Sequence, residues 1–438
     1  MDWRQMVDDK LMSPQEAIQA VKPGDQVMVA PINGTPYTLC QALYDRRQEL
    51  WGMRVDHPAA LFPWVQPGEE GAFQLRDLYA TAVNRDMVNA GEVWYLPTAC
   101  WREGEIPEGF LQEPDVYLVP ISPPDRHGYC SFGPCVFLSP TCCRKSRTVI
   151  AEVHENFIRT GGENFVHISE IDRICEPTQP TGGLPLLPRN EEETMVTEVI
   201  CTLVASELVK DRDTVQIGIG TVSSAMAVHL EQKHDLGIHT ELLTSGVADL
   251  VQKGVVTGRY KTMHTGKVVG SVIVTPEEEW ALIDGNPAFE LYEFSYVDDI
   301  RNLTRQDNLV AINNSLMVDL TGQIASETVG PRVLTGVGGQ TAFSIAAKYS
   351  KGGRCISVLP SSHMVDGQRL SRIVPMLPEG AVVTVPRTLV DYVVTEQGIA
   401  NLRGKSVRER IGELIAIAHP DFRAELRREA GRLYNIDV

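Results

Sequence analysis

The stretch VKPGDQVMVA at residues 21–30 decides the fold, because it recurs as VKDRDTVQIG at residues 209–218 of a chain of 438 residues. In both copies a Val-Lys pair and an aspartate precede apolar, largely β-branched residues, which is typical of a turn leading into a buried strand. A second pair follows, since DRHGYCS at 125–131 is echoed by DLTGQIAS at 319–326. Short units of this kind can match by chance, but their common order and spacing favour two related halves.

Further apolar runs agree with an α/β architecture. Four runs are short, nearly continuous and rich in β-branched residues, which suits buried strands of a parallel sheet: residues 116–121, 148–153, 309–312 and 355–359. A helical stretch at 190–209 lies between them. The sequence therefore predicts an α/β fold made of two related open α/β domains.

A segment rich in Pro, Gly and acidic residues, 176–193, has the composition of a linker. We therefore place an N-terminal α/β domain at residues 1–185 and a C-terminal α/β domain at residues 190–438. In open α/β sheets, ligands bind beyond the carboxyl ends of the strands. The active site is accordingly expected in the crevice between the two domains.

Charge and cysteine content argue against several classes of protein. With 57 acidic and 40 basic residues the net charge is -17, which disfavours nucleic acid and anionic membrane surfaces as partners. No apolar run approaches the length of a membrane helix, and the first residues, MDWRQ, lack signal-peptide architecture, so we expect a cytoplasmic protein. The nine cysteines are odd in number and lack the spacing of zinc ligands, so free thiols and no metal site are predicted.

Three segments of the second half are candidates for chemistry. Residues 216–222, QIGIGTV, precede helix-like residues 223–232, and their amides could face an anion, although a plain tight turn explains them equally well. Residues 335–340, TGVGGQ, precede helix-like residues 341–349 and could stabilise developing negative charge, with a turn that binds no ligand as the alternative. Between them, Glu241 follows a strand-like run and stands at the mouth of the predicted sheet, with a turn or helix-capping acid as the alternative.

The order of these motifs resembles that of a known family. The motifs are GIG at 218–220, HTE at 239–241, AINNSLMVDLTGQIAS at 311–326, TGVGGQ at 335–340, VVTEQGIANLRGKS at 393–406 and IAHPDF at 417–422. Together they resemble the acetyl-CoA hydrolase/transferase family, and within it the 4-hydroxybutyrate and butyrate CoA-transferases. The likeness covers nearly the whole chain, including SPPDRHGYCSFG at 122–133 and FVHISEID at 165–172.

The resemblance implies a CoA-transferase that moves CoA between a short-chain acyl-CoA, such as 4-hydroxybutyryl-CoA or butyryl-CoA, and a short carboxylate such as acetate. Glu241 would attack the thioester, and an acyl-glutamyl anhydride would lead to a glutamyl-CoA thioester in a ping-pong mechanism. Gly338 and Gly339 would present amides to the glutamyl oxygen and to CoA. The other positions implied to contact CoA or the reacting groups are Gly218, Ile219, Gly220, Thr221, Val222, Asn313, Leu316, Gln340 and Glu396.

Two alternatives stay open at this point. An acyl-CoA hydrolase would use the same glutamate and let water intercept the intermediate. A non-catalytic CoA- or nucleotide-binding protein would use the glycine loops alone, and the presence of Glu241 argues against it. Coenzyme A is expected as a substrate rather than as a permanently bound cofactor, and the resemblance implies a homodimer or a larger homo-oligomer. We interpret His239, two residues before Glu241, as structural.

Overall fold

The structure is a computed structural model that describes residues 2–65, 73–98, 113–181, 190–220, 222 and 225–438. The chain divides into two compact units. Unit 1 comprises Met1–Pro185, Val269–Val297 and Val333–Gly336, and unit 2 comprises Leu186–Val268, Asp298–Arg332 and Val337–Val438. The two later segments of unit 1 were assigned to the second domain from the sequence. Within the predicted linker, residues 182–189 lie outside the described residues.

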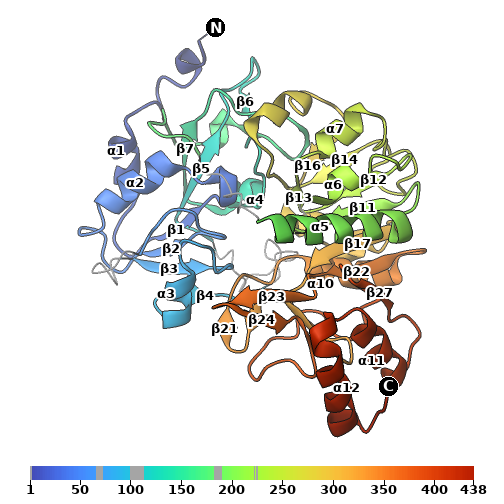
Figure 1. Cartoon of the computed structure of the whole chain (residues 1–438). Helices are drawn as coiled ribbons and strands as arrows, with labels where there is room; N and C mark the ends of the chain where they lie inside the picture. Colours follow the sequence, from blue (N-terminus) through green and yellow to red (C-terminus); the bar gives the residue numbers. More distant parts are fainter. Residues whose placement is uncertain (1, 66–72, 99–112, 182–189, 221, 223–224) are drawn as a thin grey trace. The chain divides into compact units, whose positions relative to one another are not determined.

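Unit 1 is built on a parallel sheet. Its described strands follow the order β10-β7-β5-β1-β2-β3-β4, and every neighbouring pair is parallel (Figure 1). The strands are β1 (Gln26–Val29), β2 (Arg54–Asp56), β3 (Gln74–Asp77), β4 (Trp94–Tyr95), β5 (Val116–Ile121), β7 (Thr148–Val153) and β10 (Arg173–Cys175). All six residues of β5 are buried, which explains why its sequence is a continuous apolar run rather than an alternating one.

Helices and short strands complete unit 1. Its helices are α1 (Pro14–Ala17), α2 (Tyr37–Asp45), α3 (Arg85–Ala90), α4 (Ser139–Lys145) and α8 (Phe294–Val297). Its short strands are β6 (Tyr129–Cys130), β8 (Gly161–Gly162), β9 (Val166–His167), β15 (Val272–Ile273) and β16 (Phe289–Leu291). Helix α2 buries most of its apolar side chains against the sheet. Together with apolar side chains of the strands they form one hydrophobic cluster.

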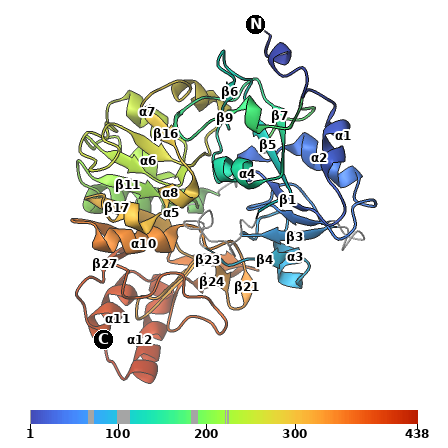
Figure 2. The same cartoon turned by 180° about the vertical axis from the view of Figure 1, so that it is seen from behind.

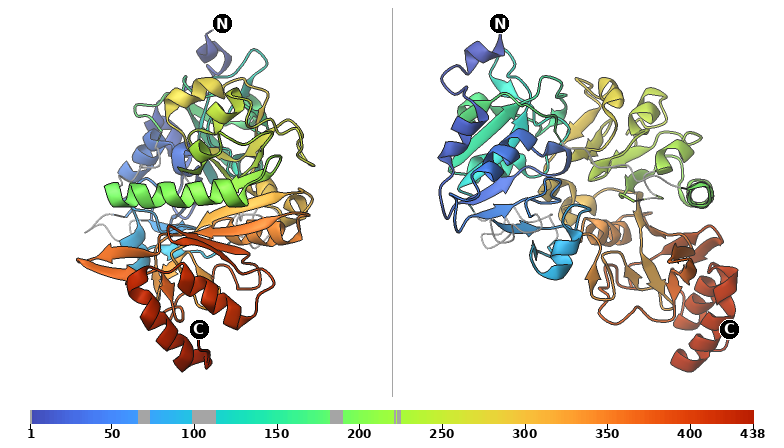
Figure 3. Two further views of the ribbon diagram at one scale, coloured as in Figure 1. Left: turned by 45° about the vertical axis from the view of Figure 1, so that its right-hand side comes forward. Right: turned by 60° about the vertical axis from the view of Figure 1, so that its left-hand side comes forward.

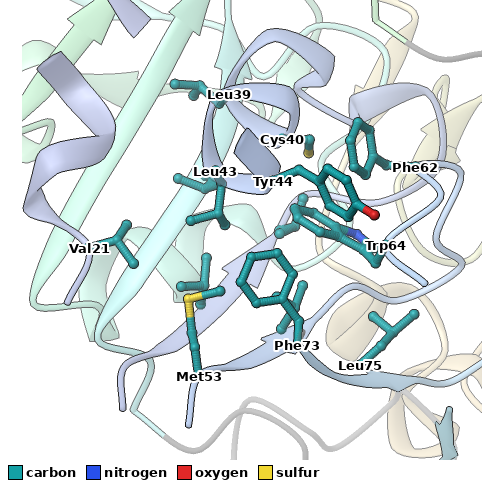
Figure 4. Close-up of a cluster of buried hydrophobic side chains, with 14 of the residues drawn as sticks. Val21, Leu39, Cys40, Leu43, Tyr44, Met53, Phe62, Trp64, Phe73 and Leu75 are labelled. Carbon is teal, nitrogen blue, oxygen red and sulfur yellow. The ribbon is translucent and has the colours of Figure 1, made fainter. Parts of the chain in front are cut away.

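An aromatic cluster lies between α2 and the strands β2 and β3 (Figure 4). The ring of Trp64 packs 4.7 Å from that of Phe62 and 5.8 Å from that of Phe73, measured between centroids. Its Nε1 donates a hydrogen bond of 2.8 Å to Nδ1 of the buried His57. Burial lowers the pKa of His57 to about 3, so this imidazole is neutral and its Nδ1 accepts.

We expect Trp64→Ala to lower the free energy of unfolding by about 3–5 kcal/mol, because it removes a ring that is 1% exposed and leaves a cavity. Trp64→Phe keeps an aromatic ring but leaves His57 Nδ1 unpaired, for a smaller loss of about 1–3 kcal/mol. Urea denaturation followed by circular dichroism measures both values. An unchanged midpoint in Trp64→Ala would contradict the packing described.

Unit 2 carries a second sheet of the same kind. Its central strands follow the order β27-β26-β22-β17-β11-β12. They are β11 (Thr214–Ile217), β12 (Gly237–His239), β17 (Leu309–Asn314), β22 (Arg354–Val358), β26 (Tyr392–Thr395) and β27 (Gly398–Asn401). Neighbouring strands from β12 to β26 are parallel, and β26 and β27 form an antiparallel hairpin.

Helices cover both faces of this sheet. Helix α5 (Glu191–Leu203) contacts β26 and β27, whereas α10 (Gln340–Tyr349) packs on β17 and β22. α5 lies in front of the sheet in Figure 1 and α10 lies in front in Figure 2, which is taken from behind. The predicted helix at 190–209 thus exists, and its last turn is a π-helix at Val204–Leu208.

The remaining elements of unit 2 are shorter, apart from two C-terminal helices that pack on each other, α11 (Val407–Ala416) and α12 (Pro420–Tyr434) (Figure 3). The others include α6 (Met226–His229), α7 (Val247–Gln252), α9 (Ile300–Leu303), β13 (Leu242–Leu243), β18 (Met317–Asp319), β19 (Ile324–Ala325), β23 (Ser362–Val365), β24 (Gln368–Ser371) and β25 (Ile373–Val374). In the described part of the chain no helix has both the length and the apolar character that crossing a membrane requires.

The repeated segments at residues 21–30 and 209–218 have the same local geometry. Asp25 accepts a hydrogen bond from the backbone N–H of Lys22, and Asp213 accepts one from that of Lys210. These aspartates lead into β1 and β11, which hold corresponding places in the orders β7-β5-β1-β2 and β22-β17-β11-β12. The two units therefore share a fold as well as a sequence pattern.

The second pair of repeated segments, at residues 125–131 and 319–326, also has the same local geometry. Asp125 Oδ1 accepts from the N–H groups two and four residues later, and Asp319 Oδ1 does the same. The glycine three residues after each aspartate, Gly128 or Gly322, has a positive φ of 84° or 96°. Because glycine adopts this conformation without steric cost, both turns keep it.

Candidate active site

The predicted site residues gather at the carboxyl edge of the unit 2 sheet. Gly218 follows β11, Glu241 lies two residues after β12, Asn313 is the last but one residue of β17, and Glu396 follows β26. Parallel strands put all four at the same edge. With a strand spacing of about 4.8 Å, the ends of β12 and β26 are separated by four spacings, or about 19 Å. The site is therefore an extended row in which Glu241 and Glu396 stand far apart.

Glu241 sits in a turn that is tied to the neighbouring strand. The hydroxyl of Thr240 donates a 2.9 Å hydrogen bond to the carbonyl of Ile217, the last residue of β11. Glu241 itself is 8% exposed. Burial raises the pKa of its carboxyl group, and hydrogen bonds from Asp298 and from the backbone of Gly339 oppose that rise. A carboxylate held in this way is shielded from water but can still ionise.

The glycine loop before α10 lies directly against this carboxyl group. A Cβ on Gly339 would lie 2.5 Å from both Cδ and Oε1 of Glu241, so the carboxyl group packs on the bare glycine backbone. Gly339 is the N-cap of α10, and the N-terminus of a helix favours negative charge. Gly338 adopts a positive φ of 58°, and Gln340, the first residue of the helix, is 8% exposed. The geometry can stabilise an anion on Glu241.

Asp298 also belongs to this cluster, and no sequence motif pointed to it. It follows α8, is 1% exposed, and its side chain forms a hydrogen bond with that of Glu241. Its Oδ2 would lie 2.6 Å from a Cβ on Gly339. Burial, together with the charge of Glu241 and the hydrogen bond to it, raises the pKa of Asp298 well above its usual value. The buried carboxyl groups of Glu241 and Asp298 thus lie side by side against Gly339.

The first glycine loop packs on the end of β17. A side chain on Gly218 would collide with Asn313 Oδ1, and one on Gly220, whose φ is 148°, would collide with the amide of Asn314. Asn314 Nδ2 in turn donates to the carbonyl of Ile219 at 3.1 Å. Because these two glycines lack side chains, the loop packs directly against the end of β17.

The rest of this loop differs in part from the sequence prediction. The side chain of Ile219 is 45% exposed, whereas Val222 is fully buried. Thr221 lies outside the described residues. The helix expected at 223–232 is shorter, since α6 spans Met226–His229. A single turn of helix provides a weak dipole, so any anion here would depend on the loop amides themselves.

Asn313 is held by a reciprocal amide pair. Its Nδ2 donates to Gln216 Oε1 at 2.9 Å, and Gln216 Nε2 donates to Asn313 Oδ1 at 3.1 Å. Both side chains are buried. Asn313 is therefore held in a fixed position near the end of β17, beside Gly218 of the first glycine loop.

Glu396 and Leu316 belong to a separate group at the other end of the row. The backbone N–H of Ser361 donates to Glu396 Oε2 at 2.9 Å, and the Ser361 hydroxyl donates to Oε1. The carbonyl of Leu316 accepts a hydrogen bond of 3.3 Å from Nη1 of Arg372, whose backbone N–H donates to the carbonyl of Ser361. No sequence motif pointed to Arg372, which places a partly buried cation beside the predicted CoA-lining backbone.

His239 is a buried neighbour of the turn that carries Glu241. It is 1% exposed, and its ring lies edge-on to that of His264 with centroids 6.5 Å apart. Its side chain is thus packed in the interior at the end of β12, and its structural role stays a prediction.

Family models match most of the chain. The N-terminal domain of the acetyl-CoA hydrolase/transferase family matches residues 1–182, and its C-terminal domain matches residues 277–430. The chain therefore belongs to the acetyl-CoA hydrolase/transferase family, as its motifs indicated.

Individual relatives of the chain indicate which type of enzyme within the family it is. The chain is 36% identical to the 4-hydroxybutyrate coenzyme A transferase of Clostridium kluyveri, over 98% of this chain and 99% of that protein. Among solved structures, RipA from Yersinia pestis superposes with a TM-score of 0.90 at 32% identity and full coverage of both chains. The 4-hydroxybutyrate CoA-transferase of Porphyromonas gingivalis gives a TM-score of 0.77 at 34% identity, over 98% of this chain and 100% of that one.

Hydrolases of the family are less similar. Relatives named as acetyl-CoA hydrolases align with 48 to 58% of this chain at 27 to 31% identity. The relatives that align over nearly the whole chain, at 31 to 36% identity, are named as CoA-transferases. The chain is thus an enzyme of the CoA-transferase type.

Proposed function

We propose that the enzyme exchanges CoA between a short-chain acyl-CoA, 4-hydroxybutyryl-CoA or butyryl-CoA, and a short carboxylate such as acetate, through a glutamyl-CoA thioester on Glu241. The observation that supports this most strongly is the buried Glu241 carboxyl group lying against Gly339 at the N-terminus of α10. Full-length similarity to the 4-hydroxybutyrate enzyme of Clostridium kluyveri supports the choice of substrates. Coenzyme A acts here as a substrate and leaves with the product.

The proposed reaction has four steps. Glu241 attacks the thioester carbonyl, the C–S bond breaks, and CoA thiolate leaves an acyl-glutamyl anhydride. The thiolate then attacks Cδ of Glu241 and expels the first carboxylate, which gives glutamyl-CoA. A second carboxylate attacks this thioester to form a mixed anhydride, and the thiolate finally takes the new acyl group and frees Glu241. Each step exchanges one activated acyl group for another, so thioester energy is conserved.

The surroundings of Glu241 fit these requirements. Low exposure keeps water from the anhydride and the thioester, both of which hydrolyse readily. The Gly339 amide donates to the carboxyl group and would also stabilise the oxyanion formed when its carbonyl is attacked. We propose that the glycine loop at Gly218 to Gly220, which follows the neighbouring strand β11, contacts CoA along the same sheet edge.

Mass spectrometry tests the covalent intermediate. After incubation with butyryl-CoA and no acceptor, we expect a mass increase equal to CoA minus one water, located on the peptide that contains Glu241. Addition of acetate should discharge the adduct, and Glu241→Gln should never acquire it. Full transfer activity without modification of Glu241 would overturn the mechanism.

The rate at which butyryl-CoA is consumed, measured with and without acetate as the acceptor, distinguishes transferase activity from hydrolase activity. A transferase should consume little butyryl-CoA alone and much more when acetate is present, with acetyl-CoA as the product. Equal rates of loss, with free CoA as the product in both cases, would favour the hydrolase. We also propose a cytoplasmic location, which the eight described cysteines support because all are buried and none forms a disulfide.

A further inference from the structure

We propose that Asp298 is protonated in the working enzyme and donates a hydrogen bond to the Glu241 carboxyl group, so that its hydroxyl and the Gly339 amide form a two-donor oxyanion site. The inference rests on the proposed function, because the oxyanion arises only if Glu241 forms the covalent intermediate. It assigns a catalytic role to a residue that the sequence motifs left aside.

The geometry brings three groups to one point. A Cβ on Gly339 would meet Glu241 Cδ and Oε1 at 2.5 Å and Asp298 Oδ2 at 2.6 Å, so both carboxyl groups converge on the same face of that glycine. The two side chains are hydrogen-bonded to each other. An ionised carboxylate only accepts hydrogen bonds, so one member of the pair must hold a proton. At 8% and 1% exposure, two charges side by side would lack the water that screens them.

The surroundings decide which member keeps the proton. Glu241 receives the Gly339 N–H at the start of α10, which stabilises its anion. Among the described residues, Asp298 Oδ1 has no hydrogen-bond partner, so ionised Asp298 would lack comparable support. The pKa of Asp298 is accordingly raised well above its usual value by burial and by Glu241. The proton therefore belongs to Asp298.

Other titratable groups nearby are engaged elsewhere. Asp299, the next residue, accepts from Nε and Nη2 of Arg301 at 2.9 and 2.6 Å. His239, two residues before Glu241, lies against the ring of His264. Glu241 is the ionisable group that acts on the pKa of Asp298. The pair can thus be treated as one coupled system with two apparent pKa values.

The Asp298 hydroxyl has a specific task in each thioester step. When a thiolate or carboxylate attacks Cδ of the acylated Glu241, the electron pair of the C=O bond moves onto the glutamyl oxygen. A neutral O–H donor beside that oxygen stabilises the new charge more than it stabilises the uncharged carbonyl. The proton stays on Asp298 throughout, so the donor is unchanged when the tetrahedral intermediate collapses and no external acid or base is required.

Two variants of similar shape test this role. Asp298→Asn keeps a hydrogen-bond donor but cannot ionise, whereas Asp298→Leu keeps the branched shape and removes the donor. We expect Asp298→Leu to slow the formation and the acetate-dependent discharge of glutamyl-CoA by about 10²–10³-fold, and Asp298→Asn to stay within about 10-fold of wild type. Rapid quenching followed by mass spectrometry of the Glu241 peptide gives both rates.

The pH profile of kcat/KM gives a readout that a merely structural residue would not change. Activity should rise with pH as Glu241 ionises, and should fall again once the pH passes the raised pKa of Asp298, because ionised Asp298 loses its donor. Asp298→Asn should lack that alkaline fall. If Asp298→Leu does not fold, the profile of Asp298→Asn still decides.

The outcomes separate the two proposals. A wild-type rate of adduct formation in folded Asp298→Leu, or an alkaline fall retained in Asp298→Asn, would overturn the role of Asp298 alone. A wild-type enzyme that transfers CoA without any adduct on Glu241 would overturn the proposed function and the oxyanion site together.

Discussion

Replacing Glu241 with Gln is expected to lower kcat for CoA transfer by about 10⁴-fold or more, because the proposed mechanism then loses its nucleophile. The amide has nearly the same size as the carboxylate, so it should pack against Gly339 as Glu241 does. KM for butyryl-CoA should change little. Steady-state assays of acetyl-CoA formation from butyryl-CoA and acetate measure both constants.

Glu241→Asp refines this test by moving the carboxylate rather than removing it. The shorter side chain withdraws the nucleophile by about one C–C bond, and a misplacement of that size can cost about 10²-fold in rate. Glu425→Gln is the matched control, since Glu425 is exposed on α12 and should behave as wild type. Activity of Glu241→Gln within about tenfold of wild type would rule out Glu241 as the nucleophile.

The sequence predicted the sheets well because their residues are buried on both faces. Strand β5 and the first four residues of β17 are continuous apolar runs, and parallel strands in open α/β folds have that composition. The aspartates at 25 and 213 marked the same turn twice, and the structure gives both the same hydrogen bond to a lysine N–H. Repetition within one chain supplied information that either turn alone lacks.

Other features depend on contacts between distant residues. Asp298 and Glu241 are 57 positions apart, and SYVDDI around Asp298 is no different from any acidic turn, so only the folded chain reveals their hydrogen bond. The grouping of 269–297 with unit 1 likewise follows from tertiary packing rather than composition. The helix after Gly220 was overestimated because its apolar pattern continues beyond the single turn of α6.

Gly339→Ala is expected to reduce kcat by about 10²-fold although it adds a single methyl group. The backbone of Gly339 has φ -93°, so alanine fits its conformation and the effect comes from the methyl group alone. That group would lie 2.5 Å from Glu241 Cδ and Oε1 and 2.6 Å from Asp298 Oδ2. Since both carboxyl groups are buried, they must shift, and displacing a nucleophile by about 1 Å costs about 10²-fold.

Gly412→Ala is the matched control for this change. Gly412 lies inside α11, and a Cβ there meets no atom within 4 Å, so alanine should leave kcat unchanged and stabilise the helix by up to about 1 kcal/mol. Wild-type kcat in Gly339→Ala would mean that Glu241 works from another position. Equal loss of adduct formation and of discharge is expected, since in both steps the same glutamyl carbon must stay against the Gly339 amide and the Asp298 hydroxyl.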